Sequence, residues 1–150
     1  MTKESNRIDN LSWKILEELQ ENARISYTEI GRKIGLTGPA VAERVKKMEE
    51  DGIINGYRAA IDLHSIGYSL TAIISVSINA GNIHNFLRYI NSVKEVFECN
   101  RVTGSSSVVL KVALRDPLEL EKLVNSLIEY GSPTTSIVLS TPISHRVFRK

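Results

Sequence analysis

One stretch of the chain combines cations with the spacing needed to recognise a polyanion. Between residues 36 and 48 the charged side chains are Arg44, Lys46 and Lys47, against Glu43 alone. Lysine and arginine bind phosphate oxygens, and a helix that carries them can lie in the major groove with its first residues near the base edges. These residue types therefore predict contact with double-stranded DNA.

The first turn of the same stretch is built from small residues. Thr37 is suited to cap a helix, and Pro39 fits the first turn because its missing N–H is not needed there. Gly38 and Ala40 leave room for a duplex to approach, and the free N–H groups of this turn can bind a phosphate. We predict that eight residues contact DNA: Thr37, Gly38, Pro39, Ala40, Glu43, Arg44, Lys46 and Lys47.

Position around the helix gives these residues different tasks. Steps of 100° per residue gather Val41, Val45 and Met48 on one apolar stripe, which must face the rest of the domain. The outward residues are expected to contact either bases (Pro39, Ala40 and Glu43) or phosphates (Lys46 and Lys47).

Arg44 lies at the border of the apolar stripe, and two roles for it remain open. It can reach a phosphate, or it can brace the domain through a carboxylate such as Glu29 or Glu49. A generic three-helix domain with a solvated basic face is the alternative to the whole interpretation. The capped helix before this one and the exit Gly-Ile-Ile-Asn-Gly-Tyr after it favour DNA binding.

Capping signals make this helix the third of a helix-turn-helix domain. Asp9 or Asn10 can cap a first helix, and Ser26 with Glu29 three residues later forms a capping box for a second. Glycines follow the second and third helices, where a left-handed residue ends a helix. The predicted helices cover residues 10 to about 21, 27–34 and 38–50.

Beyond residue 69 the pattern changes to alternating strands and helices. The predicted strands cover residues 70–78, 96–102, 108–114 and 136–141, the helices cover 83–92 and the stretch from 117, and 144–148 may be read as an added edge segment. The order βαββαβ is the ferredoxin-like plan, so the fold class is α+β. If both helices cover one face of the sheet, the other face is an uncovered apolar surface that favours a homodimer.

Composition limits the alternatives. A hydrophobic fraction of 42% with 24% charged residues is typical of a globular protein, and no apolar run approaches the roughly 18 residues that span a bilayer. The single cysteine excludes an intrachain disulfide and a cysteine-based metal site. Neither the three histidines nor the serines at 105–107 have the partners that a metal or a nucleophile needs. We expect a cytoplasmic protein with no membrane contact, no cofactor and no enzymatic activity.

Net charge gives DNA binding little support. Residues 1–68 hold ten Lys/Arg against eleven Asp/Glu, whereas residues 69–150 hold nine against six. A nucleic-acid-binding half is expected to be basic. The sequence therefore predicts that affinity depends on a few placed cations and on several copies binding together.

Nearly the whole chain resembles the Lrp/AsnC family of prokaryotic transcription regulators. The resemblance is most specific in the helical region, and it continues into the region of strands and helices that follows. The matching segments are Ile8-Asp9, Ile15-Leu16, Leu19, Ala23 to Ser26, Glu29 to Gly31, Gly35 to Thr37, Val41, Arg44 to Glu49, Gly52 to Tyr57, Leu63, Ile66 to Tyr68, Val102 to Gly104 and Leu110 to Val112.

The resemblance implies a winged-type helix-turn-helix domain (residues 1–56), an extended linker (57–68) and a ligand-sensing, oligomerising domain (69–150). Members of the family form dimers that assemble further, often into octamers. Amino acids commonly bind where dimers meet, near a turn that corresponds here to Thr103, Gly104, Ser105, Ser106 and Ser107. The implied function is a DNA-binding transcription regulator that uses the helix near residues 38–50 and responds to a small molecule. The alternative is an architectural protein that wraps DNA with little sequence preference and no amino-acid effector.

This chain departs from the family in that turn. The family usually carries acidic residues after the glycine, where this chain has Ser105, Ser106 and Ser107. A hydroxyl does not supply the charge that pairs with the ammonium group of an amino acid. We hypothesise that amino-acid effectors bind weakly here, that another ligand binds, or that no effector is needed.

Overall fold

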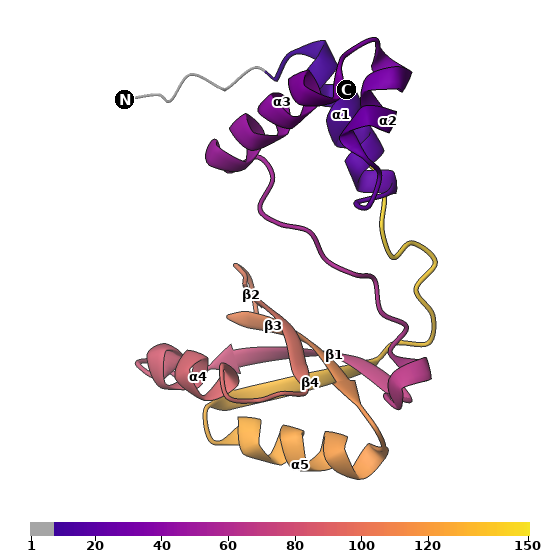
Figure 1. Ribbon diagram of the computed structural model, residues 1–150. Helices are drawn as coiled ribbons and strands as arrows, with labels where there is room; N and C mark the ends of the chain where they lie inside the picture. Colours follow the sequence, from indigo (N-terminus) through magenta and orange to yellow (C-terminus); the bar gives the residue numbers. More distant parts are fainter. Residues whose placement is uncertain (1–7) are drawn as a thin grey trace. The chain divides into compact units, whose positions relative to one another are not determined.

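The computed structural model describes residues 8–150, which divide into two compact units (Figure 1). The helical unit comprises residues up to 60 together with 143–150, and the sheet unit comprises residues 61–142. We had assigned everything from 69 to 150 to the second domain, but the last eight residues group with the helices. The functional domain limits (1–56, 57–68 and 69–150) stay predictions.

The helices of the helical unit have the predicted limits. They are α1 (Asn10–Glu21), α2 (Tyr27–Ile34) and α3 (Gly38–Glu50). Asp9, Ser26 and Thr37 each accept a hydrogen bond from the backbone N–H three residues later, which satisfies a donor that the first turn leaves free. Gly35 has a φ of 79° and ends α2 in the left-handed conformation.

The turn between α2 and α3 requires a glycine on the inner side of α2. A Cβ added at Gly31 would lie 2.4 Å from the carbonyl oxygen of Leu36, in the turn that follows. The N–H of Leu36 donates to the carbonyl of Gly31 at 2.9 Å. This close approach sets how α3 leaves α2, and it therefore positions the predicted recognition helix.

The sheet unit has the βαββαβ order, as predicted. After a short 3-10 helix (His64–Ile66), its elements are β1 (Leu70–Ile78), α4 (Ile83–Ile90), β2 (Val96–Arg101), β3 (Val108–Leu114), α5 (Pro117–Ile128) and β4 (Gly131–Ile137). The four strands form one antiparallel sheet in the order β2-β3-β1-β4. This is the ferredoxin-like topology, so the predicted α+β fold class is confirmed.

One face of the sheet is covered and the other is open. Ile74, Val76 and Leu110 point to the covered face and pack with Phe86 of α4 and Leu127 of α5. The alternate residues of β1 and β4 on the open face are mainly hydroxyl residues: Thr71, Ser75, Ser77, Ser132, Thr134 and Ser136. Ser75 lies opposite Thr134, and Ser77 lies opposite Ser132. The open face is therefore less apolar than we predicted.

The last strand was predicted in the wrong place. We expected it at 136–141, whereas β4 runs from Gly131 to Ile137. Gly131 and Pro133 make this segment look like a turn. However, β4 lies at the edge of the sheet, where a proline can face outward without losing a ladder hydrogen bond. At Gly131, a Cβ would lie 2.1 Å from the carbonyl oxygen of Ser77.

The predicted edge segment at 144–148 is also wrong. These residues form no strand in the described structure. They belong to the helical unit and contact α1 instead.

Candidate nucleic-acid interface and effector turn

The inner side of α3 is fixed by a small core. Val41, Val45 and Met48 are 0 to 3% exposed and pack against Ile15 of α1 and Ile30 of α2. The predicted apolar stripe is therefore buried, and its opposite side must face outward. Thr37, Pro39, Glu43, Lys46 and Lys47 are exposed, whereas Gly38, Ala40 and Arg44 are half-buried.

The two lysines of α3 differ in their surroundings. The Lys46 ammonium lies 3.8 Å from the Glu50 carboxylate, one turn further along the helix, and its side chain is 75% exposed. A surface pair of this kind holds the side chain only weakly. Lys46 is therefore available to a phosphate at little cost, and Lys47 is exposed beside it.

Arg44 makes a contact that we did not predict. Its guanidinium donates to Asp9 Oδ2 at 2.6 Å and to the buried Ser12 hydroxyl at 3.1 Å. Of the two predicted roles, the bracing one therefore has a partner, but that partner is Asp9 rather than Glu29 or Glu49. The pKa of Asp9 is lowered to about 2, because its carboxylate accepts from the Ser12 N–H, from Arg44 and from the Ser12 hydroxyl.

Two further side-chain pairs connect elements of the helical unit. Glu49 of α3 accepts a hydrogen bond from the Tyr57 hydroxyl at 2.9 Å, so it holds the exit segment against α3. Partial burial raises the pKa of Tyr57, and the Glu49 carboxylate raises it further. Lys33 of α2 pairs with Glu18 of α1, which also raises the pKa of Lys33. The first pair thus holds the exit segment on α3, and the second holds α2 on α1.

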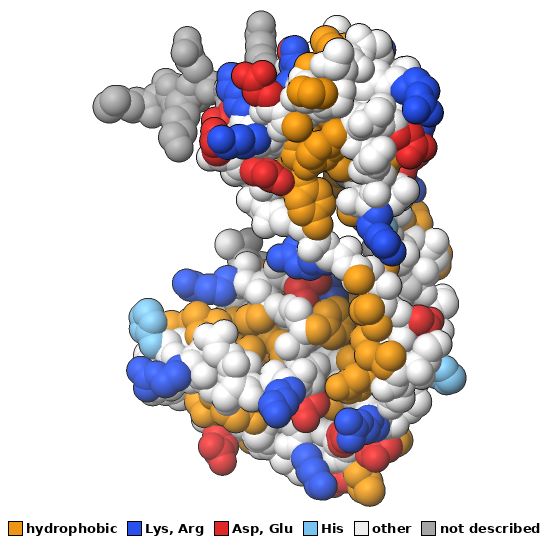
Figure 2. All heavy atoms as spheres, viewed as in Figure 1, with side chains coloured by type: hydrophobic (Ala, Val, Ile, Leu, Met, Phe, Trp, Pro, Cys, Tyr) orange, Lys and Arg blue, Asp and Glu red, His pale blue; other side chains and the backbone are white. Residues whose placement is uncertain are grey.

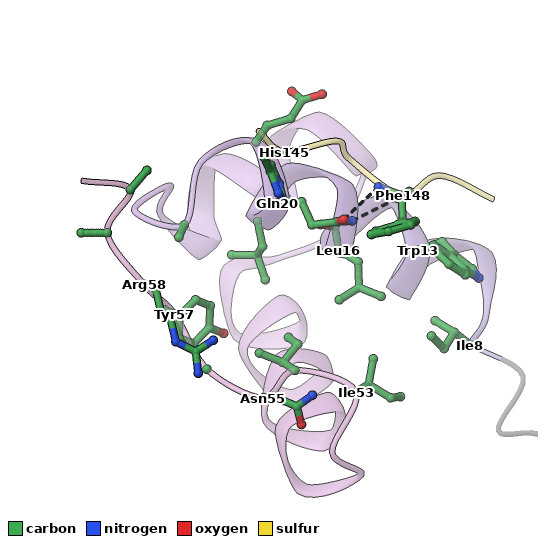
Figure 3. Close-up of a pocket in the computed structure, with 17 residues that line it drawn as sticks. Ile8, Trp13, Leu16, Gln20, Ile53, Asn55, Tyr57, Arg58, His145 and Phe148 are labelled. Atoms are coloured by element: carbon green, nitrogen blue, oxygen red, sulfur yellow. Dashed lines mark hydrogen bonds between the residues drawn. The ribbon is translucent and has the colours of Figure 1, made fainter. Parts of the chain in front are cut away.

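A surface that sequence reasoning missed lies on α1. The Gln20 side chain accepts from the Phe148 N–H at 2.9 Å and donates to the Phe148 carbonyl at 3.0 Å (Figure 3). His145 and Phe148 line one side of a hollow of about 750 Å³, whose other walls include Trp13, Leu16 and the exit segment 53–60. In the sequence, this contact is indicated only by opposite charges: cations at 146, 149 and 150 and glutamates in α1.

Acidic and basic side chains are interspersed on the helical unit. Figure 2 shows them next to one another on its visible face rather than in a patch of one sign. The positive potential that DNA needs therefore depends on which carboxylates are paired.

The predicted effector turn joins β2 to β3 and is fastened to β1. The N–H of Ser107 donates to the Val76 carbonyl at 2.9 Å, and its hydroxyl accepts from the Ile78 N–H at 3.1 Å. The Ser77 hydroxyl donates to the carbonyl of Ser105 at 2.6 Å. Gly104 has a φ of 114°, and Thr103, Gly104 and Ser105 are exposed.

The hydroxyls of this turn are not equally available. Ser107 is already used to hold the turn on β1, whereas no hydrogen bond of the Ser105 and Ser106 hydroxyls is found in the described residues. The turn thus offers a ligand exposed backbone groups and the hydroxyls of Thr103, Ser105 and Ser106.

Residues 8–150 contain neither a metal-binding cluster nor a helix that could span a membrane. No cluster of three or more His, Cys, Asp or Glu side chains is arranged to hold a metal ion there. No helix in this range is long and apolar enough to cross a membrane.

Two family models match the chain. Residues 8–55 match a winged helix-turn-helix DNA-binding domain, and residues 71–148 match the Lrp/AsnC ligand binding domain. Among curated relatives, the HTH-type transcriptional regulator LrpB of Bacillus subtilis is 40% identical over 126 residues. That alignment covers 84% of this chain and 85% of LrpB.

Solved structures of similar proteins agree with these matches. The structure of E. coli AsnC has a TM-score of 0.84 and 32% identity, covering 93% of this chain and 97% of that one. The transcriptional regulator NMB0573 of Neisseria meningitidis, solved as a complex with L-Met, has a TM-score of 0.88 and 25% identity. The superposition covers 94% of this chain and 96% of the NMB0573 chain. None of these relatives supports the architectural alternative.

Proposed function

The chain belongs to the Lrp/AsnC family of DNA-binding transcription regulators, and from this premise we propose which of its residues bind DNA and which bind an effector. The observation that supports the proposal is the buried inner stripe of α3, which leaves Pro39, Glu43 and Lys46 on the outer side. The relatives are regulators, and we propose that the chain catalyses no reaction. We also propose that it works in the cytoplasm, where bacterial and archaeal DNA lies.

In the proposed complex, α3 enters the major groove with its N-terminus first. The N–H groups near Thr37 and Gly38 bind a phosphate, aided by the positive end of the helix dipole. Pro39, Ala40 and Glu43 lie at the base edges, and a glutamate there can accept from the amino group of cytosine.

The lysines and Arg44 have separate roles in this proposal. Lys46 and Lys47 contact phosphates, where they supply affinity for any sequence. Arg44 is better placed to position α3 than to bind DNA, because Asp9 and Ser12 already hold its guanidinium. Its effect on DNA binding would therefore come from the orientation of the helix.

Salt titration of DNA binding tests these assignments. Lys46→Ala or Lys47→Ala should reduce the slope of log K against log[salt] by about 1 and weaken specific and mixed-sequence DNA alike. Glu43→Gln should instead change the preferred site. An unchanged slope and affinity in both lysine variants would contradict the phosphate contacts, and footprinting upstream of the chain's own gene would locate the site.

We further propose that the turn at Thr103–Ser107 contacts an effector. The related NMB0573 binds L-Met, which makes an amino acid the first ligand to test. Because Ser105, Ser106 and Ser107 carry no charge, we propose that the ammonium group is poorly paired and that free amino acids bind weakly. Calorimetry with an amino-acid mixture tests this, and micromolar affinity abolished by changes in the turn would contradict it.

Oligomerisation is typical of the family, and we propose that copies of the chain meet through the open sheet face. The Ser/Thr side chains of β1 and β4 surround Ile73 there, which is 37% exposed. A dimer that assembles further, up to an octamer, would present several helix-turn-helix domains to one duplex, and binding of one would favour the next. Light scattering with and without DNA measures the assembly.

A further inference from the structure

We propose that the C-terminal tail, residues 143–150, is an electrostatic part of the DNA-binding surface. Docked along α1, it neutralises the acidic side of that helix and raises the affinity for DNA of any sequence. The inference rests on DNA binding by the family, but not on which residues of α3 touch the bases.

The charge of the helical unit depends on the tail. Residues 1–60 hold ten Lys/Arg and ten Asp/Glu, so they are neutral as a group. The tail adds Arg146, Arg149 and Lys150 and no acidic residue, which brings the helical unit to +3. Residues 61–142 hold six Lys/Arg and seven Asp/Glu, a net of −1. When the chain is divided as it folds, its positive charge lies in the unit that binds DNA.

Specific contacts hold these cations on α1. Gln20 pairs with both backbone groups of Phe148, in the way that a neighbouring strand would (Figure 3). The aromatic ring of Phe148 lies near Trp13 and Leu16 in the same view. The chain on either side of Phe148 is therefore held close to the helix.

The cations of the tail face the carboxylates of α1. Arg149 lies 2.7 Å from Glu21 and 3.9 Å from Glu17, and the Lys150 ammonium donates to Asn10 Oδ1 at 2.6 Å. Since Lys33 pairs with Glu18, all three glutamates of α1 meet a cation, and the tail supplies the cation for two of them. Arg146 is exposed and adds a further charge.

These charges act on DNA across α3, because α1 packs on the inner side of that helix and the duplex lies on its outer side. α1 packs directly on α3 through the shared core, and packed helix axes are about 8–10 Å apart. The screening length is about 10 Å at 0.1 M salt. With the width of α3 added to that spacing, Glu17 and Glu21 lie more than one screening length from the duplex at 0.1 M salt, but within the roughly 30 Å that applies at 0.01 M. Without a partner they would repel the phosphates at low salt, and Arg149 removes that repulsion.

The test compares two variants of the full chain with equal loss of charge. In the tail variant, Arg146→Gln, Arg149→Gln and Lys150→Gln are combined. In the matched control, Arg88→Gln, Lys94→Gln and Lys122→Gln are combined, since these three cations of the sheet unit are also exposed. Both bind a mixed-sequence duplex in a fluorescence anisotropy titration at several salt concentrations.

We expect the tail variant to lose on the order of tenfold in affinity at 0.01 M salt, with the loss shrinking as salt rises toward 0.1 M. The control should lose less than the tail variant, because its three cations belong to the unit that does not carry α3. Wild-type affinity in the tail variant, or equal losses in the two variants, would overturn the proposal. Circular dichroism confirms that both variants are folded before they are compared.

A third variant separates docking from charge. Gln20→Ala removes both hydrogen bonds to Phe148 and leaves every charge in the chain. We expect a smaller loss of affinity, about two- to threefold, because the freed tail places its cations less often beside α1. Faster hydrogen exchange at the Phe148 amide should accompany it. Unchanged affinity in Gln20→Ala, with a clear loss in the tail variant, would show that the charges act without docking. That result would overturn the proposal that the tail must be docked on α1.

Discussion

The helix-turn-helix and the C-terminal tail are both held on α1, but by different forces. α2 and α3 pack through Ile30, Val41 and Val45, which are at most 1% exposed. The tail is held by hydrogen bonds and ion pairs at the surface, and its large apolar side chains, Ile143 and Phe148, are 60% and 73% exposed. Apolar burial is insensitive to salt, whereas surface pairs are screened by it. The comparison indicates that packing orients the recognition helix and that surface charge adjusts how strongly it binds.

The largest expected effect tests the packing side of this comparison. Ile30→Ala should lower the free energy of unfolding of the helical unit by about 2–5 kcal/mol, because it leaves a cavity in a small core. Phe148→Ala, which removes a larger but exposed side chain, should cost less than about 1 kcal/mol. Urea unfolding followed by circular dichroism measures both. Equal losses would mean that the tail is part of the core.

The next effect tests the turn that joins α2 to α3. Gly31→Ala places a Cβ against the carbonyl of Leu36, and we expect a loss of about 1–3 kcal/mol despite the better helix propensity of alanine. Gly38→Ala is the matched control, since its Cβ would meet the Thr28 hydroxyl at 3.0 Å, and a side chain can rotate away. Thermal unfolding distinguishes the two, and a Gly31→Ala variant as stable as wild type would contradict the required close approach.

A smaller effect depends on pH. Asp9 has a folded pKa of about 2 against an ordinary value of 3.8, so it stabilises the fold above pH 4, and this contribution is lost as the pH falls toward 2. The side chain is 53% exposed, so we expect less than about 1 kcal/mol. Asp9→Asn still caps α1, and its deficit relative to wild type should be present at pH 5 and vanish near pH 2. A deficit independent of pH would contradict the ionised pair with Arg44.

The smallest effect is on stability when the tail loses a charge. Arg149→Gln removes pairs whose side chains are 32 to 63% exposed, so the free energy of unfolding should change by less than about 0.5 kcal/mol. A large loss of stability in urea unfolding would show that the tail supports the fold, and would remove the distinction between the two regions.

The helix-turn-helix was predictable because its signals are local. Asp9, Ser26 and Thr37 cap the backbone within three residues of themselves, and Gly35 ends its helix by its own φ. The apolar stripe of α3 likewise follows from helix geometry alone. Such features need no knowledge of the rest of the fold, and the structure has the helix limits that they predict.

The missed features all depend on residues far apart in the sequence. Arg44 pairs with Asp9, 35 residues away, and Gln20 bonds to Phe148, 128 residues away. β4 contains the turn-like residues Gly131 and Pro133 and is a strand because β1 lies beside it. The contacts of the DNA-binding residues and the effector stay predictions, because they lie with partners outside the chain.

The way the chain returns to its first unit has a consequence for assemblies. The tail leaves the sheet unit at Pro142 and reaches α1 through an eight-residue segment held by side-chain contacts. The groups of α1 that make those contacts are also present on every other copy of the chain, which is a condition for domain swapping. Where several copies are held together, high local concentration allows the tails to exchange. Exchanged tails would then link the helical units of neighbouring copies through the same contacts that each chain makes with itself.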